Sequence, residues 1–543
     1  LNPVQIDRIE VLSAPPANYD GDATGAINII MKKGQNTGCS GHLLAEVPVL
    51  FSGVYLFPSY SLNYSRQKIN LYTSYNGELT YLDLHEQISR KVSNDYGTNE
   101  ISIDQYVRQK DWSHRFHFGA DYFLSERDQL NFYSFYNPYS RELDGKALYQ
   151  ISGTTGNSSE AIKADTDMNT GLFYSLYYKH NFKKEGSEIT ADVSNYSLKA
   201  ENRTEFTSGE PENNSPATVN VVKPEQNALS IRIDYRTRFG ERLGLGTGVK
   251  AKFRISEDRN SGFEYIDNTY AFYLTAGYKS EQSDLGLGLR MEKSTTEIYN
   301  AFASNFPVLL PDFSFRYKLS SQQSIQLSVN RSIRRPDLYQ LNPAIARDDP
   351  FTISKGNPAL NPELTSNIFI EHSVQSDGNY FASRIFLTRS TGVINNLMFI
   401  SDDNTFVRET QNLGTMDQAG IQFTGSVKLR FLTLNPYVKL FGLRTKPNRL
   451  AEKYNISPRE TAGFESSLSA IVSLKHDFAF LFTLQYNSAK NQIQGNSFSD
   501  LLYFIAAEKT FKQKIKLGIV SAIPFSNSFT YNGSEINGNG FTS

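Results

Sequence analysis

The segment Leu229-Ser-Ile-Arg-Ile-Asp-Tyr-Arg236 alternates strictly between apolar and polar side chains. In an extended strand successive side chains point to opposite faces, so the apolar residues would share one face. That face carries Leu229, Ile231, Ile233 and Tyr235. The opposite face carries Ser230, Arg232, Asp234 and Arg236.

The same two-residue period recurs throughout the chain. It returns in residues 112–124, 243–255, 272–278, 285–291, 325–329, 421–429 and 515–520. Sustained alternation over about 5–13 residues is typical of strands, and no segment has a competing helical period. The sequence therefore predicts an all-β protein.

The composition narrows the class of protein. Of the 543 residues, 39% are hydrophobic, below the share of roughly 45–50% in most globular proteins. Aromatic residues nevertheless make up 13%, which is too many for a disordered chain. Lys and Arg number 55 against 56 Asp and Glu, so nothing suggests nucleic acid as a partner. Cys39 is the single cysteine, which excludes an internal disulfide.

The sequence is compatible with only one kind of membrane-spanning structure. No apolar run reaches the roughly 18 residues that a transmembrane helix needs. A β-barrel remains, because its alternating strands look polar when averaged. No signal peptide precedes the first predicted strand and Leu1 is not a Met, so we expect a mature protein or an internal fragment.

The predicted connections alternate between short turns and long polar loops. Short turns are expected at 66–68, 125–128, 183–187, 240–242, 280–284, 320–323, 376–379, 430–432, 475–477 and 512–514. Long loops are expected at 84–108, 141–167, 201–226, 256–268, 295–310, 332–362, 389–418, 444–460 and 487–500. Beside the short turns stand Phe123, Phe182, Phe239, Tyr278, Tyr317, Phe431, Phe478 and Phe511. Short periplasmic turns, long outer loops and aromatic girdles are typical of outer-membrane barrels.

A soluble sandwich or propeller would give the same alternation, with one strand face on a core and the other in water. Two features favour the barrel: strands of about 10–14 residues exceed the usual 5–6, and no repeat of propeller-blade length occurs. About 21 strands fit between Gly41 and Phe525, and a barrel near 22 strands has a lumen that needs a plug. We predict a transmembrane antiparallel β-barrel of about 22 strands.

Near the N-terminus stand Ile6-Asp-Arg-Ile-Glu-Val11, Pro16-Ala-Asn-Tyr-Asp20 and Gly25-Ala-Ile-Asn-Ile-Ile-Met-Lys-Lys33. Together they resemble the end of the plug domain of TonB-dependent receptors, and Pro16–Asp20 is closest to the outer-membrane barrel family common in Bacteroidetes. The resemblance assigns a plug motif to Ile6, Arg8, Glu10, Val11, Gly25 and Asn28. On the residues alone, Ile6–Val11 predicts a short strand, and Gly25 suits a close approach of the backbone to the wall.

The second half of the chain contains another match. Asn330-Arg-Ser-Ile-Arg-Arg-Pro-Asp-Leu338 is followed by Gly356-Asn-Pro-Ala-Leu-Asn-Pro-Glu-Leu-Thr365. This pair is similar to the barrel signature of the same receptors, and it assigns that signature to Arg335, Pro336, Gly356, Asn357, Pro358, Pro362 and Glu363. The prolines between 336 and 362 exclude a ladder strand, so we expect an extracellular loop that re-enters the wall at 361–365.

The resemblance implies two domains. Residues 1–36 would be the C-terminal part of the plug, and residues 37–543 the barrel with long extracellular loops and short periplasmic turns. A complete receptor has a longer plug, a TonB box and a final strand with a terminal aromatic residue. None of these is found here, so we expect TonB to bind an N-terminal segment absent from this chain, and the closing strand to be missing.

The resemblance also implies a function. Receptors of this family bind a ligand between the extracellular loops and the plug, and TonB-driven gating of the plug imports it. Five cations are expected to form a basic stripe on the lumen face: Arg232, Arg236, Lys250, Lys252 and Arg254. The stripe would either pair with plug carboxylates or attract an anionic ligand such as a siderophore. The ligand itself is not identified by the sequence.

Two other functions stay open. The barrel would be a structural or docking subunit of an outer-membrane complex, with a surface lipoprotein or other subunits as partners, or a passive pore, which even a partial plug disfavours. An enzyme is not expected. The seven His are scattered, no Gly-x-Ser-x-Gly elbow occurs, and Gly286 and Gly288 are not followed by a helix. We expect no cofactor and no metal, and read Asp348-Asp349 as a solvated loop.

Overall fold

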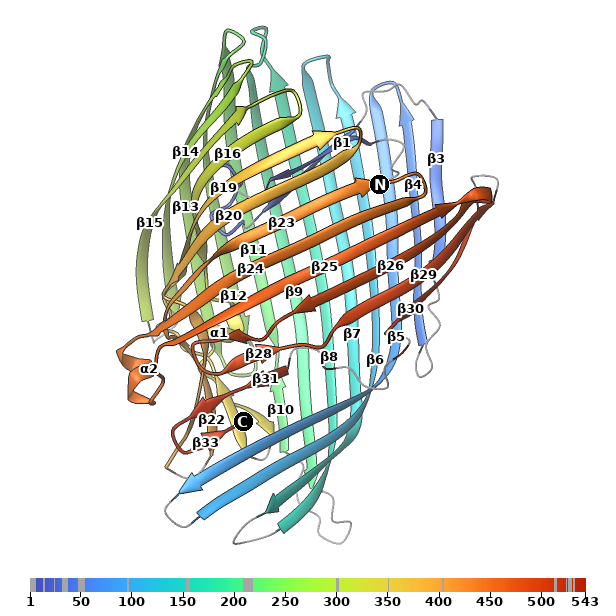
Figure 1. Cartoon of the computed structure of the whole chain (residues 1–543). Coiled ribbons are helices and arrows are strands. Elements are labelled where there is room, and N and C mark those ends of the chain that lie inside the picture. The colour runs from blue at the N-terminus through green and yellow to red at the C-terminus, as the bar shows by residue number, and fades with distance from the viewer. Residues whose placement is uncertain are drawn as a thin grey trace.

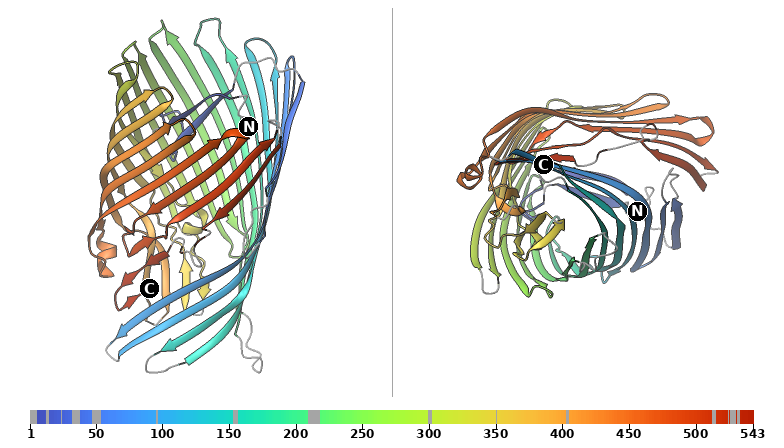
Figure 2. Two further views of the ribbon diagram at one scale, coloured as in Figure 1. Left: turned by 45° about the vertical axis from the view of Figure 1, so that its right-hand side comes forward. Right: turned by 90° about the horizontal axis from the view of Figure 1, so that it is seen from below.

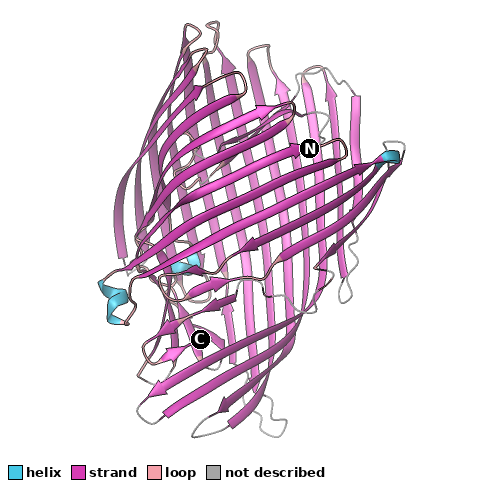
Figure 3. Ribbon diagram, viewed as in Figure 1, coloured by secondary structure: helices cyan, strands magenta, loops and turns pink. Residues whose placement is uncertain are grey.

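The chain is nearly all β, and the helices are single turns (Figure 3). The computed structural model describes residues 6–12, 15–23, 25–31, 38–46, 54–94, 97–152, 157–208, 218–298, 302–349, 351–402, 405–511, 515–523, 525, 530 and 533–543. The described helices are α1 (Leu338–Leu341), α2 (Arg449–Lys453) and the 3-10 turn η2 (Lys475–Asp477). None of the helices in these ranges is long or apolar enough to cross a membrane.

One antiparallel sheet curls into a barrel (Figures 1 and 2). Along the described ladder, 21 wall strands pair in chain order. They are β3 (Gly38–Glu46), β4 (Val54–Arg66), β5 (Ile69–Asn94), β6 (Gly97–Phe123), β7 (Asp128–Ser152), β8 (Asn157–Asn181), β9 (Glu188–Ser208), β11 (Pro224–Phe239), β12 (Leu243–Asp258), β13 (Phe263–Lys279), β14 (Ser283–Ile298), β15 (Phe302–Lys318), β16 (Gln323–Arg334), β19 (Glu363–Ser376), β20 (Asn379–Thr391), β23 (Gly414–Lys428), β24 (Leu432–Pro447), β25 (Arg459–Leu474), β26 (Phe478–Asn487), β29 (Leu502–Phe511) and β30 (Ile515–Ala522). The predicted fold class is confirmed.

The remaining strands form small additions to the wall. A hairpin of β1 (Ile6–Leu12) and β2 (Ala26–Met31) lies within the outline of the barrel (Figures 1 and 2). A four-stranded sheet contains β17 (Ala346–Asp349), β18 (Thr352–Lys355), β22 (Phe406–Asn412) and β21 (Ile394–Ile400). A three-stranded sheet contains β27 (Lys490–Asn491), β28 (Asn496–Phe498) and β31 (Gly533–Glu535). β10 (Thr218–Val222) pairs with β9, β32 (Asn537–Gly538) pairs with β33 (Phe541–Thr542), and β33 pairs with β5.

The outer face of the wall is apolar and exposed. On β11, Leu229, Ile231, Ile233 and Tyr235 are 36–44% exposed, so the apolar face of this strand is open to the surroundings. The eight aromatic residues predicted beside the short turns are likewise exposed, from 40% to 57%. A soluble sandwich would bury such a face, whereas a barrel in lipid presents it to the acyl chains, with aromatic side chains at the interface.

Every second connection of an antiparallel wall returns to the same rim, and the predicted short turns share one rim. On the other rim the connections after β9, β16, β20, β24 and β26 are long, but those after β5, β7, β12 and β14 span only two to four residues. The predicted alternation of short and long connections therefore holds only in part, and several loop bounds are wrong. Residues 84–94 and 97–108 are strand, and β5, β6, β7 and β8 have 25 to 27 residues. Their polar ends pair with one another beyond the apolar band, so they lack the one-sided pattern that identified the other strands.

Apolar cores lie where long connections fold back on the wall. One cluster joins Phe263, Tyr265 and Ile298 of the wall to Leu341 of α1 and to Leu360 and Ile394. Another joins Met398 and Phe406 to Phe541. The connection between β16 and β19 is therefore a packed structure inside one end of the barrel. It re-enters the wall at Glu363, within the predicted segment 361–365.

Candidate functional site

Residues 15–23 between β1 and β2 lie in the lumen, and we call them the luminal segment. Two backbone hydrogen bonds turn the chain, from Tyr19 N to Pro16 O at 2.9 Å and from Ala23 N to Asp20 O at 2.9 Å. Proline and Asp-Gly sequences favour such turns, because they preset the backbone or accept strained angles. Ala17 is buried against the wall, where a Cβ added at Gly288 of β14 would meet its Cβ at 2.8 Å.

Gly21 lies directly against the wall. A Cβ there would lie 2.5 Å from Leu310 Cδ1, and Ile333 N of β16 donates to Gly21 O at 2.8 Å. Only glycine fits such a place without displacing its neighbours. The expectation for Gly25 is wrong, since Gly25 is exposed. The Asp20-Gly21-Asp22 sequence is the signal that would have identified the contact.

Asp20 ties the luminal segment to two wall cations. Its carboxylate accepts from Lys250 Nζ at 2.7 Å and lies 3.6 Å from Arg290 Nη2. Burial raises the pKa of Asp20, but the ammonium of Lys250 and the guanidinium of Arg290 outweigh burial and hold the pKa below its ordinary value. Asp20 is therefore ionised at neutral pH.

Glu292 on β14 extends this network to the barrel signature. Its buried carboxylate accepts from Arg290 Nε at 2.5 Å and from Arg335 Nη2 at 2.5 Å. Arg335 follows β16 directly and also donates to Ser294 Oγ at 3.1 Å. The ion pairs thus connect Asp20, Arg290, Glu292 and Arg335, from the luminal segment to the start of the long connection.

The basic stripe is divided between two places. Lys250, Lys252 and Arg254 line a cavity with the luminal segment, together with Arg335 and Pro336. Arg232 and Arg236 do not line it and instead pair with Asp234 at 3.4 Å and Glu188 at 3.6 Å.

Within the stripe, Arg254 pairs with Asp267 at 2.9 Å. Lys252 has no ion pair with any residue in the described ranges, but Asp20 and Asp22 lie near enough to act on its charge. Four of the five cations therefore have carboxylate partners, one of them in the luminal segment.

The rest of the barrel signature shapes the connection between β16 and β19. A Cβ at Gly356 would lie 2.6 Å from the carbonyl oxygens of Gln340 and Asn342, so a larger residue does not fit. Asn357 N donates to Gln340 O at 2.7 Å, and Pro358 and Pro362 follow in the same turn region before β19. Glu363 pairs with Arg334 at 2.7 Å.

The plug motif is only partly described. β1 and β2 pair with Glu10 opposite Asn28 and Val11 opposite Ile27, as the predicted strand requires. The side chains of Ile6, Arg8, Glu10 and Val11 lie outside the described residues. On β2, Asn28 is exposed and Ile27 is 69% exposed.

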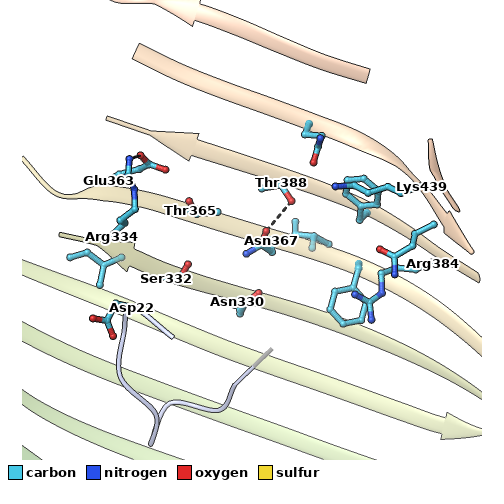
Figure 4. A pocket seen from close by; sticks show the side chains of 16 residues that line it. Asp22, Asn330, Ser332, Arg334, Glu363, Thr365, Asn367, Arg384, Thr388 and Lys439 are labelled. Carbon is cyan, nitrogen blue, oxygen red and sulfur yellow. Dashed lines mark hydrogen bonds and ion pairs between the residues drawn. The ribbon is translucent and has the colours of Figure 1, made fainter. Parts of the chain in front are cut away.

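A second cavity, of about 450 Å³, adjoins the luminal segment (Figure 4). Asp22 reaches it from the luminal segment, and the wall strands supply the rest. Its polar wall residues are Asn330, Ser332, Arg334, Glu363, Thr365, Asn367, Arg384, Thr388, Gln418, Gln422 and Lys439. The sequence prediction included only Glu363 of this group. The missed residues stand on one face of five strands, and only the register brings them together.

No group of three or more His, Cys, Asp or Glu side chains that could hold a metal ion occurs among the described residues. The two cavities contain charged and hydrogen-bonding groups around a bent segment of the chain. Such groups can hold a ligand by reversible hydrogen bonds and ion pairs.

Comparison with known proteins adds three findings. The sequence model described as the outer membrane protein beta-barrel family matches residues 180–543. No curated protein sequence matches the chain.

Solved structures match over nearly the whole chain. The siderophore receptor PirA from Pseudomonas aeruginosa matches with a TM-score of 0.65 at 13% identity, covering 97% of this chain and 85% of that one. The FrpB iron transporter from Neisseria meningitidis matches with a TM-score of 0.64 at 13% identity, covering 99% and 87%. The copper transporter OprC matches with a TM-score of 0.64 at 12% identity, covering 98% and 81%. At such identities the likeness concerns the fold alone.

Proposed function

Because the chain belongs to the outer membrane protein β-barrel family, we propose that it is an outer-membrane receptor that imports a ligand by TonB-driven gating of a plug. The barrel lies in the outer membrane and its neighbours in structure are receptors and transporters. We assign residues 1–36 to the end of the plug, and TonB to an N-terminal segment outside this chain. The sequence Pro16–Asp20 supports membership of the barrel family that is common in Bacteroidetes.

One observation carries the proposal: polar contacts tie the luminal segment to the wall of the lumen. Asp20 pairs with Lys250 and Arg290, and Gly21 O accepts one backbone hydrogen bond. Breaking such polar contacts costs little free energy when water can replace them, because the separated groups are then hydrated. A force on the segment can therefore release it without exposing a large apolar core, which a gate requires.

The second supporting feature is that Asp22 lines the same cavity as the wall residues. A ligand in that cavity contacts both the gate and the wall. Ligand binding and movement of the segment are then coupled, because a ligand with different contacts in the two states shifts their balance.

A reversible crosslink tests the gate. With Cys39→Ser as background, Ala17→Cys and Gly288→Cys bring two thiols together, since the Cβ positions lie 2.8 Å apart and a disulfide accepts about 3.5–4.5 Å after a small shift. We expect the oxidised variant to lose TonB-dependent uptake and the reduced variant to regain it. Uptake is measured as depletion of compounds from the medium, by mass spectrometry, with and without the protein and TonB.

A matched disulfide within the wall is the control. Ser324 and Ser373 are cross-strand partners whose hydroxyl oxygens lie 2.9 Å apart, so Ser324→Cys with Ser373→Cys leaves the luminal segment free. Uptake should survive oxidation of this pair. If no compound requires both the protein and TonB for its depletion, transport is refuted. A docking subunit with a lipoprotein or other partner then becomes the better account.

A further inference from the structure

The cavity of Figure 4 has a neutral hydrogen-bonding floor. Asn330 lies opposite Asn367, Asn367 opposite Thr388, and Thr388 opposite Gln418. These four side chains form one row across β16, β19, β20 and β23, which we call the amide–hydroxyl row. With about 4.7–4.9 Å between strands, the row extends over about 14 Å. Ser332 and Thr365 are cross-strand partners beside it.

Much of the hydrogen-bonding capacity of the row is free. Thr388 Oγ1 donates to Asn367 Oδ1 at 2.9 Å, which leaves the amide NH₂ of Asn367 without a described partner. Asn330, Ser332 and Gln418 make no side-chain hydrogen bond to any residue in the part of the chain that the structure describes. Amides and hydroxyls both donate and accept, so the row matches a ligand that does the same.

The cations of the cavity are already neutralised. Arg334 pairs with Glu363 at 2.7 Å, Arg384 with Glu371 at 2.6 Å, and Lys439 with Glu465 at 3.6 Å. An anionic ligand would have to compete with these carboxylates.

The aromatic rings of the cavity and the carboxylate of Asp22 also disfavour a charged ligand. The guanidinium of Arg384 covers the ring of Phe369 at 4.1 Å and the ammonium of Lys439 covers that of Phe386 at 5.0 Å, so the rings are occupied. Asp22 makes no ion pair with a described cation, and its charge would repel an anion.

We propose that the amide–hydroxyl row binds a neutral saccharide, whose hydroxyl groups donate and accept hydrogen bonds along the row. The inference rests on the proposed receptor function and names the ligand class of its cavity. It also separates the two cavities: the one lined by the basic stripe holds the luminal segment, and the one lined by the row holds the ligand. A free peptide is less suitable, because its charged ends need counter-ions that this cavity keeps paired.

Calorimetry on the purified full chain in detergent tests the ligand class. The probes are a panel of neutral oligosaccharides, oligosaccharides of uronic acids of matched length, and an end-blocked neutral hexapeptide. We expect binding by a neutral oligosaccharide only. Asn367→Leu and Thr388→Val should each weaken it about tenfold or more, because nearly isosteric apolar groups leave ligand hydroxyls unpaired.

Thr483→Val is the matched control. Thr483 lies opposite Ser469 on the lumen face of β26, outside this cavity, so its loss should not change the affinity. Failure of every neutral oligosaccharide to bind would overturn the inference. Equal or tighter binding of the uronic acids or the peptide would also overturn it. The same holds if neither Asn367→Leu nor Thr388→Val changes the affinity. This binding needs no TonB, so saccharide binding without TonB-dependent uptake would refute transport while leaving the ligand class intact.

Discussion

At the scale of single residues, the buried carboxylate of Glu292 is shared by two guanidinium groups. The side chain of Glu292 is 2% exposed and that of Arg290 3%, so removing the negative charge leaves two cations in a desolvated place. The residue identities alone do not reveal this, because Arg335 lies 43 positions further along the chain.

We expect Glu292→Gln to destabilise the barrel by about 3–5 kcal/mol, the cost of breaking a buried ion pair on one side. Thermal unfolding followed by heat-modifiable mobility measures it. Glu257→Gln is the control, since Glu257 lies in an exposed pair with Arg259. Equal stability of the two variants would contradict a structural role for the Glu292 network.

The ion pairs of Asp20 predict how the stability of the luminal segment depends on pH. Its pKa lies below the ordinary value of 3.8, so the contribution of its pairs is complete above that value and is lost only as pH falls through the lower folded pKa. Protection of residues 15–23 from hydrogen exchange, corrected for intrinsic rates, should be the same at pH 7 and pH 5. Asp20→Asn should reduce it at both. A decline in the wild type between pH 7 and pH 5 would argue against the ion pairs.

At the scale of elements, the alternation in β11 decides which face meets lipid. Ile233 is 44% exposed on the outer face, and Arg232 points into the lumen beside Asp234. We expect Ile233→Arg to harm assembly far more than Arg232→Ile, since a charge at mid-depth in lipid costs about 2–4 kcal/mol. Membrane yield and heat-modifiable mobility compare the two, and equal damage would reverse the assigned facing.

At the scale of the whole molecule, the long connections all return to one rim, and we assign the opposite rim, which has only short turns, to the periplasm. In a Cys39→Ser background, Glu126→Cys lies in a short turn, and Glu460→Cys lies near the opposite rim with its side chain 72% exposed. A membrane-impermeant maleimide should label position 460 on intact cells and position 126 only after permeabilisation. The opposite pattern would invert the topology.

The sequence by itself determined the wall. Alternation of the kind in Leu229–Arg236 needs no information beyond neighbouring residues, and it identified the strands across the apolar band and the outward aromatic residues. It failed where polar residues lie on both faces, as in the paired ends of β5 and β6, because one-sided burial is what creates the pattern.

Only the tertiary structure decided the site. The amide–hydroxyl row takes one residue from each of four strands, and Asp20 meets Lys250 across 230 positions of the chain. Such contacts depend on strand register and on the path of the luminal segment. A shift of one residue in register would turn every lumen side chain outward, and nothing local in the sequence records which residues then meet.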